Sequence, residues 1–480
     1  MNIPVIIYSL GNILKVEALL LIPSLAVAAI YKEPAKNMLG FIYVILLLLF
    51  LSRVTLHFKP KRMSMQAKDG FIIVALSWVF LSFFGALPFV FSGEIPSIVD
   101  AFFETSSGFT TTGSSVLTDV EALSNSMLFW RSFTHLIGGM GVLVFTLAVL
   151  PSTGFESVHV MKAEVPGPVF EKLASKMQKT ARILYAIYIF MTAVLVVLLV
   201  IGKMPLFDSL VHAFGAAGTG GFSIKAKSIG YYNSIYIDVV ISTAMIMFGV
   251  NFNLYYLIII GEARKLLHSE ELRIYLGVVA GAVILIFLDL ISKFGFSWNL
   301  LRDSYFQVSS IITTTGFSTV DFNNWPVFSK TVLLLLMFIG GCAGSTAGGL
   351  KVSRVGILFK LGKSELKRIT QPGRIVNTKF DGEALSDKIS ISVLLYFAIY
   401  MFIFFASVLI VSLDSPDFVT AFSAVAATFN NIGPGFSTVG PCESFAGFNN
   451  FTKILFSFIM IAGRLEIYPI LILFKNILKR

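Results

Sequence analysis

The chain has 480 residues, of which 56% are hydrophobic and only 13% are charged, and its mean hydropathy is +0.83. This composition excludes an ordinary soluble domain and indicates an integral membrane protein. The net charge of +10 must then be assigned loop by loop rather than taken as a sign of nucleic-acid binding, and two cysteines, Cys342 and Cys442, are too few for a disulfide framework.

Ten apolar segments are long enough to cross a bilayer, which takes about 20 residues. The first two, at 5–30 and 38–57, predict an N-terminal hairpin. The other eight follow in pairs, at 71–92 and 124–150, 181–203 and 233–260, 272–293 and 327–350, and 388–413 and 450–474. We therefore expect an all-α membrane protein with five domains: the hairpin 1–60 and four repeats at 61–160, 161–265, 266–375 and 376–480.

The basic residues are distributed unevenly between the loops. They gather in 53–68, 162–182, 264–273 and 351–374 and at the C-terminus, whereas residues 93–123 and 414–450 contain no Lys or Arg. Positively charged loops remain in the cytoplasm. We therefore expect a multi-pass protein of the plasma (inner) membrane, surrounded by the lipid bilayer, with both termini in the cytoplasm.

A Gly/Thr motif lies between the two apolar segments of every pair and recurs at intervals of about one hundred residues. The four copies are Thr110–Ser115, Thr219–Ser223, Thr313–Ser318 and Gly433–Ser437. About a dozen moderately apolar residues precede each copy, too few to span the membrane. Each repeat thus predicts a helix, a re-entrant pore loop with a short pore helix, and a second helix, with the four loops around one central pore.

An aspartate stands at the same offset before the glycine in the first three copies: Asp100, Asp208 and Asp303. We expect these residues to be the N-caps of the pore helices. The C-terminal ends of the helix dipoles would then point toward the membrane centre and favour a cation there. The fourth copy departs from this pattern, because Asp417 lies further from Gly435.

The composition of the motifs indicates a monovalent cation. A ring of backbone carbonyls can replace the hydration shell of K⁺, and glycine permits the conformations that point carbonyls inward. None of the four motifs contains a carboxylate, whereas acidic rings are expected for divalent cations.

The second apolar segment of the third repeat is interrupted by a glycine-rich run at 340–349, which has too much glycine for a continuous helix. Irregular backbone at this depth must be buried in protein or line a water-filled cavity, so this run is a candidate gate below the filter. The alternative is that its glycines only allow close helix packing. Arg464, deep in the last apolar segment, is either part of a closed barrier that repels K⁺ or paired with a glutamate or backbone carbonyls.

Together these features resemble the Trk/Ktr/HKT superfamily of potassium transport proteins, whose single chain builds a pore from four such units. The resemblance covers essentially the whole chain. It is closest to the pore subunit of Trk systems, because of the N-terminal hairpin and the form of the last loop, Asn431–Gly435. It is further carried by Trp130–Arg131, Gly138–Gly141, Ala163–Pro168 and Gly463–Ile467.

The resemblance implies one filter glycine in each loop, namely Gly113, Gly221, Gly316 and Gly435, with Gly433 open as the alternative fourth member. It implies that backbone carbonyls of the filter residues bind K⁺, from Thr111, Thr112, Gly113, Thr219, Gly220, Gly221, Thr314, Thr315, Gly316, Ile432, Gly433 and Gly435. It implies an intramembrane gate formed by Gly340, Gly341, Gly344, Ser345, Thr346, Gly348, Gly349 and Arg464.

The same resemblance implies a homodimer regulated by a cytoplasmic ring of TrkA-like, nucleotide-binding subunits, for which the basic loops offer a surface. K⁺ is the expected transported ion, Rb⁺ should follow it, and permeation by Na⁺ is left open. This chain itself is expected to bind no cofactor and no nucleic acid.

Two other classes of function make different demands on the sequence. A proton- or sodium-coupled K⁺ symporter needs a titratable or ion-coordinating site at the middle of the bilayer, and Arg464 and Glu466 are the obvious deep charges. A membrane-embedded enzyme needs a catalytic constellation, and the five histidines have no metal-ligand spacing. We therefore expect gated K⁺ uptake, with symport as the alternative.

Overall fold

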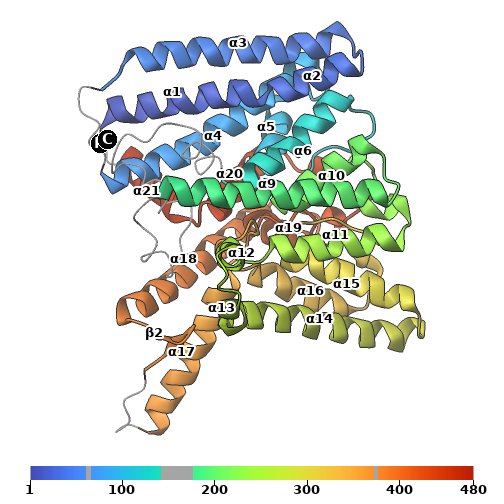
Figure 1. The fold of residues 1–480 in the computed structure, drawn as a ribbon, viewed down its shortest axis with the longest axis vertical. Coiled ribbons are helices and arrows are strands. Elements are labelled where there is room, and N and C mark those ends of the chain that lie inside the picture. The colour runs from blue at the N-terminus through green and yellow to red at the C-terminus, as the bar shows by residue number, and fades with distance from the viewer. Residues whose placement is uncertain (1, 61–65, 142–176, 372–376, 479–480) are drawn as a thin grey trace.

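The computed structural model describes residues 2–60, 66–141, 177–371 and 377–478. These residues are almost entirely helical (Figure 1). The exception is a two-stranded antiparallel hairpin of β1 (Lys379–Phe380) and β2 (Glu383–Ala384). The predicted all-α class is confirmed, and the apolar character of the helices is that of a multi-pass membrane protein.

The N-terminal hairpin consists of α1 (Ile3–Leu20) and α2 (Ile22–Ile30) followed by the antiparallel α3 (Ala35–His57). Gly11 lets α1 approach α3 closely, because a Cβ at this position would clash with the side chain of Thr55. The hairpin packs beside the helix that follows it, so it lies at one edge of the molecule (Figure 1).

The rest of the chain passes four times through the same order of elements. Each pass begins with a long helix of 25 or 26 residues: α4 (Ala67–Ser92), α9 (Met177–Ile201), α14 (Glu270–Phe294) and α18 (Asp387–Val411). A short helix of 12 to 15 residues comes next: α5 (Ile98–Phe109), α10 (Leu206–Gly218), α15 (Trp298–Ile312) and α19 (Phe418–Phe429).

After a loop, each pass has a further helix of 13 to 15 residues: α6 (Asn125–Gly139), α11 (Ile235–Phe248), α16 (Val327–Ile339) and α20 (Asn450–Arg464). The chain then turns into α12 (Phe252–Ile259) and the short α13 (Arg264–His268), α17 (Val352–Thr370), and α21 (Tyr468–Leu478). Single 3₁₀ turns lie in the connections: Ser228–Tyr232, Phe322–Asn324, Ser437–Val439 and Phe445–Gly447.

Two of the ten predicted spans are wrong as continuous helices. The segment predicted at 233–260 bends by 90° between α11 and α12, and the segment at 450–474 bends by 118° between α20 and α21. Within the described residues, six helices are long and apolar enough to cross a membrane, or eight if each bent pair counts as one span. At the second bend, Glu466 and Ile467 both adopt positive φ, which a β-branched residue rarely does.

The predicted N-caps of the first three short helices are also wrong. Asp100 and Asp208 lie in the first turns of α5 and α10, and Asp303 lies further inside α15. The N-caps are Ser97, Pro205 and Ser297. Only the fourth short helix has an aspartate cap: the Asp417 carboxylate accepts the Thr420 N–H at 2.9 Å.

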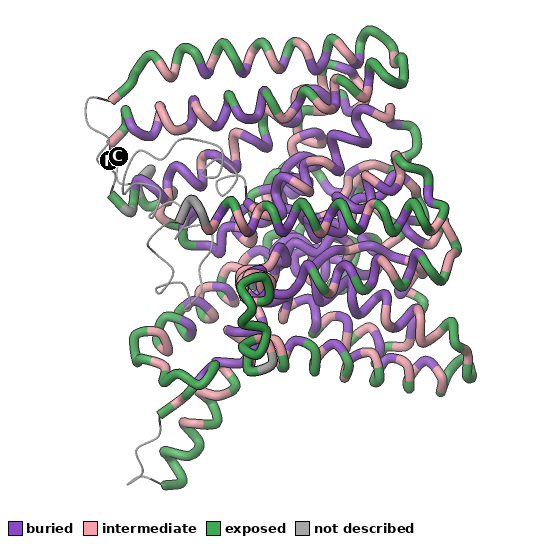
Figure 2. The backbone as a smooth tube through the Cα atoms, viewed as in Figure 1, coloured by how far each residue is buried: buried purple, intermediate pink, exposed green. Residues whose placement is uncertain are grey.

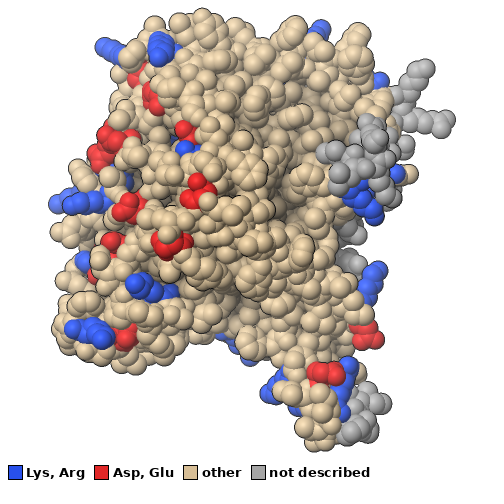
Figure 3. Space-filling model, turned by 180° about the vertical axis from the view of Figure 1, so that it is seen from behind, with Lys and Arg blue, Asp and Glu red and all other residues tan. Residues whose placement is uncertain are grey.

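Burial and charge agree with a surrounding bilayer. Buried residues concentrate where the short helices and loops meet, while outer helices expose one face (Figure 2). Charged side chains gather near two opposite ends of the molecule, and a broad uncharged band separates them (Figure 3). The start of α1 and the end of α21 lie near one another at one of these ends (Figure 1).

We predict that Gly138→Ala will destabilise the protein. An added Cβ would clash with the carbonyl oxygen of Phe109 at the end of α5, and overpacking of this kind costs about 1–3 kcal/mol. Gly281→Ala is the control, because nothing lies within 4 Å of a Cβ added on that face of α14. Thermal unfolding in detergent should show a lower midpoint for Gly138→Ala only. Equal midpoints for the two variants would contradict this packing.

Candidate ion-conduction site

The four loops that follow the short helices share one backbone conformation. Each contains a glycine with positive φ: Gly113 at 84°, Gly221 at 72°, Gly316 at 85° and Gly433 at 106°. Each also has a left-handed residue two positions earlier: Thr111, Thr219, Thr314 and Asn431, with φ between 54° and 57°. Left-handed backbone at non-glycine residues is uncommon and costs of order 1–3 kcal/mol each, so its repetition marks a site that the surrounding structure enforces.

The same backbone hydrogen bond closes all four turns. The residue just before each glycine donates its N–H to the carbonyl five positions back, within the preceding short helix. The donors are Thr112, Gly220, Thr315 and Ile432, and the N–O distances are 2.8, 2.8, 2.8 and 2.9 Å. The four short helices, far apart in the sequence, thus end in the same hydrogen-bonded turn.

The four loops meet in a closed ring. A Cβ added at Gly113 would clash with the carbonyl oxygen of Gly220, one at Gly221 with that of Thr315, and one at Gly316 with that of Ile432. The ring closes because a Cβ added at Gly433 would lie 3.0 Å from the carbonyl oxygen of Thr112. Every glycine is therefore required by the close approach of its neighbour as well as by its own φ. We call these four loops the carbonyl ring.

The fourth ring glycine is Gly433, whereas the resemblance had named Gly435 first. Gly433 has the positive φ, the preceding left-handed Asn431 and the contact with the first loop. Gly435 lacks a positive φ, and a Cβ there would meet the side chains of Val439 and Ser423 instead. The sequence could not separate the two glycines because Pro434 lies between them and both fit the motif.

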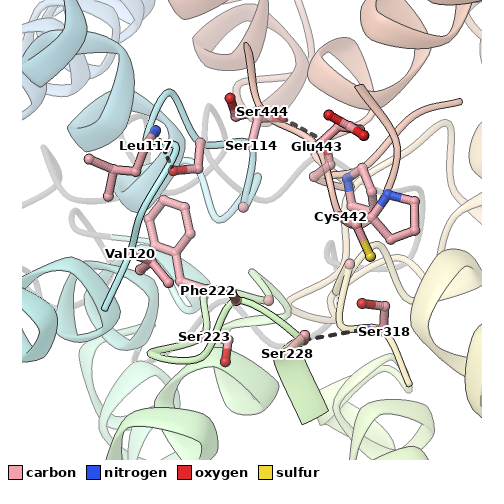
Figure 4. Close-up of a pocket in the computed structure, with 18 of the residues that line it drawn as sticks. Ser114, Leu117, Val120, Phe222, Ser223, Ser228, Ser318, Cys442, Glu443 and Ser444 are labelled. Atoms are coloured by element: carbon pink, nitrogen blue, oxygen red, sulfur yellow. Dashed lines mark hydrogen bonds between the residues drawn. The ribbon is translucent and has the colours of Figure 1, made fainter. Parts of the chain in front are cut away.

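One side of the carbonyl ring opens into a polar pocket of about 250 Å³ (Figure 4). All four ring glycines line it, together with serines from the first three loops: Ser114, Ser115, Ser223, Ser228 and Ser318. The fourth loop contributes Cys442, Glu443 and Ser444, with Ser444 close to Ser114 of the first loop in Figure 4. Because these segments come from every repeat, the pocket exists only in the folded chain.

A buried ion pair supports the first two loops from behind. The Glu104 carboxylate lies 2.5 Å from Nε of Arg131 and also accepts the Val116 N–H at 3.1 Å. Arg131 donates to the carbonyl of Ser223 at 2.9 Å, and its guanidinium stacks 3.5 Å above the ring of Phe222. Arg131 therefore has a structural role between the first two loops. Glu104 was not predicted from the sequence, because a single Glu in a short helix forms no pattern.

The second, third and fourth loops are held by different groups. Nε2 of His212 lies 2.9 Å from the hydroxyl of Ser223, and Gln307 donates to the carbonyl of Val320 at 3.4 Å. In the fourth loop the hydroxyl of Ser423 accepts the N–H of Phe436 at 2.9 Å. Asn431 donates to the Thr112 hydroxyl at 2.9 Å, which links the fourth loop to the first.

The glycine-rich segment 340–349 lies against the carbonyl ring on the side away from the pocket. Its Gly348 N–H donates to the Thr314 hydroxyl at 2.6 Å, and a Cβ at Gly348 would clash with the carbonyl of Asn430. The helix ends at Ile339, and Gly340, Gly344 and Gly349 all have positive φ. The predicted interruption of this helix is therefore present, and it is more than a close-packing surface.

Arg464 ties this segment to another part of the chain. Its guanidinium donates to the carbonyl of Thr346 and to the carbonyls of Gly138 and Gly139, each at 2.7 Å. The pairing with backbone carbonyls that was one interpretation of the sequence is present, and it leaves the positive charge of Arg464 beside the glycine-rich segment. Nη1 of Arg464 bonds to the glycine-rich segment and Nη2 bonds to the C-terminal end of α6, so the side chain joins these two parts of the chain.

Metal ligation by side chains is not found at this site. Among residues 2–60, 66–141, 177–371 and 377–478, no group of three or more His, Cys, Asp or Glu side chains could hold a metal ion. The oxygen atoms that converge in the carbonyl ring belong to the backbone. The Ala163–Pro168 motif, which helps to carry the resemblance, lies outside the described residues.

Comparison with known proteins gives the family. The family model of TrkH, described as a cation transport protein, matches residues 36–479. The chain belongs to the TrkH family of cation transport proteins. The "Trk system potassium uptake protein TrkH" of Salmonella typhimurium is 38% identical over 416 residues, which is 85% of this chain and 86% of that protein. TrkG of Escherichia coli is 33% identical and covers 99% of this chain and 98% of its own length.

The fold agrees over its full length with a solved structure of the family. The crystal structure of the potassium transporter TrkH from Vibrio parahaemolyticus superposes with a TM-score of 0.89 at 32% identity, covering 100% of both chains. The predicted family is thus confirmed, and so is the prediction that this TrkH-family chain is a transport protein rather than an enzyme.

We predict that Arg131→Ala will be strongly destabilising. It would leave the Glu104 carboxylate buried without its partner, and breaking a buried ion pair costs about 3–5 kcal/mol. Lys225→Ala is the matched control. It breaks the exposed pair in which a hydrogen bond from Lys225 lowers the pKa of the Glu121 carboxyl, and solvent screening makes such pairs weak. Thermal unfolding should separate the variants, and similar midpoints would argue against a supporting role for the buried pair.

Proposed function

We propose that this chain is the pore subunit of a potassium uptake system, and that K⁺ crosses the membrane through the carbonyl ring. The single observation that carries the proposal is that four loops, with the same two left-handed positions, meet through backbone carbonyls and glycines. The names of the relatives, Trk system potassium uptake proteins, support K⁺ as the ion.

The chemistry of the ring fits a weakly hydrated monovalent cation. Backbone carbonyl dipoles can replace water around K⁺ without a fixed negative charge. The proposed ligands are carbonyls from the residues named for the filter, with Gly433 as the fourth glycine and Gly435 outside the ring. One glycine in each loop makes a short filter. We infer that Rb⁺ passes with K⁺ and that discrimination against Na⁺ is weaker than in filters with longer carbonyl rows.

The gate in this proposal is the segment 340–349 together with Arg464. The segment lies directly against the ring through Gly348 and Thr314, so an ion leaving the ring on that side would meet it. Arg464 adds a positive charge bonded to Thr346, which would repel a cation. Uptake then requires this segment to move aside.

Partners and orientation complete the proposal. The basic segments near 53–68, 264–273 and 351–374 would face the cytoplasm of the plasma (inner) membrane, and the polar pocket would face outward. Both termini would then be cytoplasmic. We propose a homodimer whose gate responds to a cytoplasmic ring of TrkA-like, nucleotide-binding subunits, with no cofactor on this chain.

Replacement of Gly433 by alanine should impair selectivity. The added Cβ would lie at a position with φ of 106° and 3.0 Å from the Thr112 carbonyl, so the ring must distort. Uptake of ⁸⁶Rb⁺ into proteoliposomes, with competing K⁺ or Na⁺, measures the change. We expect the preference for K⁺ over Na⁺ to fall by about tenfold, which corresponds to about 1.4 kcal/mol.

Gly435→Ala serves as the control for this experiment, because Gly435 has no ring contact in the structure. Its added Cβ is also crowded, so its expression and unfolding are measured alongside, but its K⁺ preference should stay unchanged. If Gly435→Ala alters the preference and Gly433→Ala does not, the assignment of the fourth filter glycine is wrong.

Arg464→Ala should raise ion flux in the absence of any regulatory partner. The variant loses three hydrogen bonds of 2.7 Å that join the glycine-rich segment to the end of α6, and it loses the positive charge. We expect basal ⁸⁶Rb⁺ uptake to increase by about tenfold or more. Arg464→Lys keeps the charge but cannot bond to all three carbonyls, so its basal uptake should lie between that of the parent and that of Arg464→Ala. Unchanged basal uptake in both variants would exclude Arg464 from the gate.

The driving force for uptake distinguishes the gated pore from the symporter alternative. A gated pore conducts ⁸⁶Rb⁺ down its own gradient when neither a proton nor a sodium gradient is imposed. Uptake that requires one of these gradients would favour the proton- or sodium-coupled K⁺ symporter. The Arg464→Ala protein is the better sample, because its gate should already be released.

A further inference from the structure

Glu271, the second residue of α14, bonds to the glycine-rich segment and to the helix that follows it. Its side chain is buried, and its Oε1 accepts the N–H of Ala343 at 2.7 Å and the N–H of Ser353 at 3.2 Å. Ala343 lies in the first half of the segment, and Ser353 lies in the first turn of α17. One carboxylate oxygen therefore holds the first half of the segment beside the start of α17.

This position is one where a carboxylate binds strongly. The first N–H groups of α17 have no partner within the helix, and the N-terminal end of a helix attracts negative charge. Hydrogen bonds to a charged acceptor are about twice as strong as those between neutral groups. Glu271 satisfies one such N–H and a loop N–H at once, in a buried place where water does not replace it.

The end of the segment is also held from the other side. Arg354, next to Ser353, forms an ion pair with Glu466 at the α20–α21 corner, and its guanidinium lies 4.3 Å from the ring centroid of Tyr396. The start of α17 is thus held between α14 and the last repeat. Beyond this point α17 extends away from the other helices (Figure 1).

We propose that Glu271 is a positioning residue that keeps segment 340–349 in its closed arrangement. This proposal rests on the proposed function, because it takes that segment to be the gate. While Ala343 and Ser353 are bonded to the same oxygen, the segment is tied to α14 and to the start of α17 and cannot leave the ring. Movement of α17 would separate Ser353 from Ala343 and free the segment.

Glu270, the neighbouring residue, provides a matched control. Its carboxylate pairs with Lys360 of α17 and accepts the N–H of Asp381, between β1 and β2, at 3.2 Å, so it bonds to α17 and the β-hairpin rather than to the glycine-rich segment. Glu270→Gln and Glu271→Gln remove the same charge from adjacent positions in the same helical turn. Only the second removes it from the segment.

The native Cys342 reports on the segment directly. Its thiol is free and fully buried, whereas Cys442 is exposed and can be replaced by serine. In the Cys442→Ser background, the rate of Cys342 modification by N-ethylmaleimide is measured for the parent, Glu271→Gln, Glu271→Ala and Glu270→Gln. The same proteoliposomes are assayed for ⁸⁶Rb⁺ uptake, K⁺-over-Na⁺ preference and thermal unfolding.

We expect Cys342 modification and basal uptake to rise by about tenfold in Glu271→Ala and by less in Glu271→Gln. K⁺ preference should stay near that of the parent, because the carbonyl ring is untouched. The unfolding midpoint should fall in Glu271→Ala, which leaves two N–H groups without their acceptor. Glu270→Gln should match the parent in Cys342 modification and in uptake. A merely structural role would lower the midpoint without this pattern.

Three results would overturn the proposal. Unchanged Cys342 modification in both Glu271 variants, or an equal rise in Glu270→Gln, would show that Glu271 does not hold the segment. Faster modification with unchanged uptake would show that the segment moves without opening a path, and this would remove the gate role as well. Failure of the pore proposal itself is recognised separately, as absence of K⁺-competed uptake in every variant, including Arg464→Ala.

Discussion

The structure depends on bringing four segments of backbone into contact inside a membrane protein. Backbone groups at that depth need partners, because the bilayer supplies no water. Each loop meets this demand by turning back on its own short helix, with a hydrogen bond from an N–H to the carbonyl five positions earlier. This turn contains one left-handed non-glycine residue, and the ring glycine with positive φ follows directly after it. The resulting strain is of order 1–3 kcal/mol at each non-glycine position, so the rest of the fold must hold the loops in place.

The supports differ from loop to loop although the ring itself is nearly regular. The first and second loops share the buried Glu104–Arg131 pair, while the fourth is bonded to the first through Asn431 and Thr112. A buried ion pair holds its partners strongly, but burying two charges carries a large desolvation penalty. A hydrogen bond from a neutral amide is weaker and has a smaller desolvation penalty. The four repeats therefore share the order of helices and loops, whereas the side chains that hold the loops in place differ from repeat to repeat.

The glycine-rich segment forms hydrogen bonds with a loop of the carbonyl ring and with helices that follow ring loops. It contacts the third loop at Thr314, the end of α11 at Phe248 and the end of α20 at Arg464. The segment is thus bonded to the third loop and to the C-terminal ends of two helices, α11 and α20.

The sequence by itself determined the class, the family and the order of elements. Composition required a membrane protein, and the recurrence of the Gly/Thr motif between apolar pairs indicated four loops, because both signals are local in the chain. The glycine-rich interruption after Ile339 was also readable, since ten residues with so much glycine cannot continue a helix.

Only the tertiary structure decided which glycine completes the ring, which residues cap the short helices and what Arg464 binds. Gly433 and Gly435 differ in their neighbours from other repeats, and no local pattern describes such neighbours. The same holds for Glu104 and Glu271, whose partners lie in other segments. The bends after α11 and α20 were missed because apolar composition continues through them, while the turn is imposed by contacts with the rest of the fold.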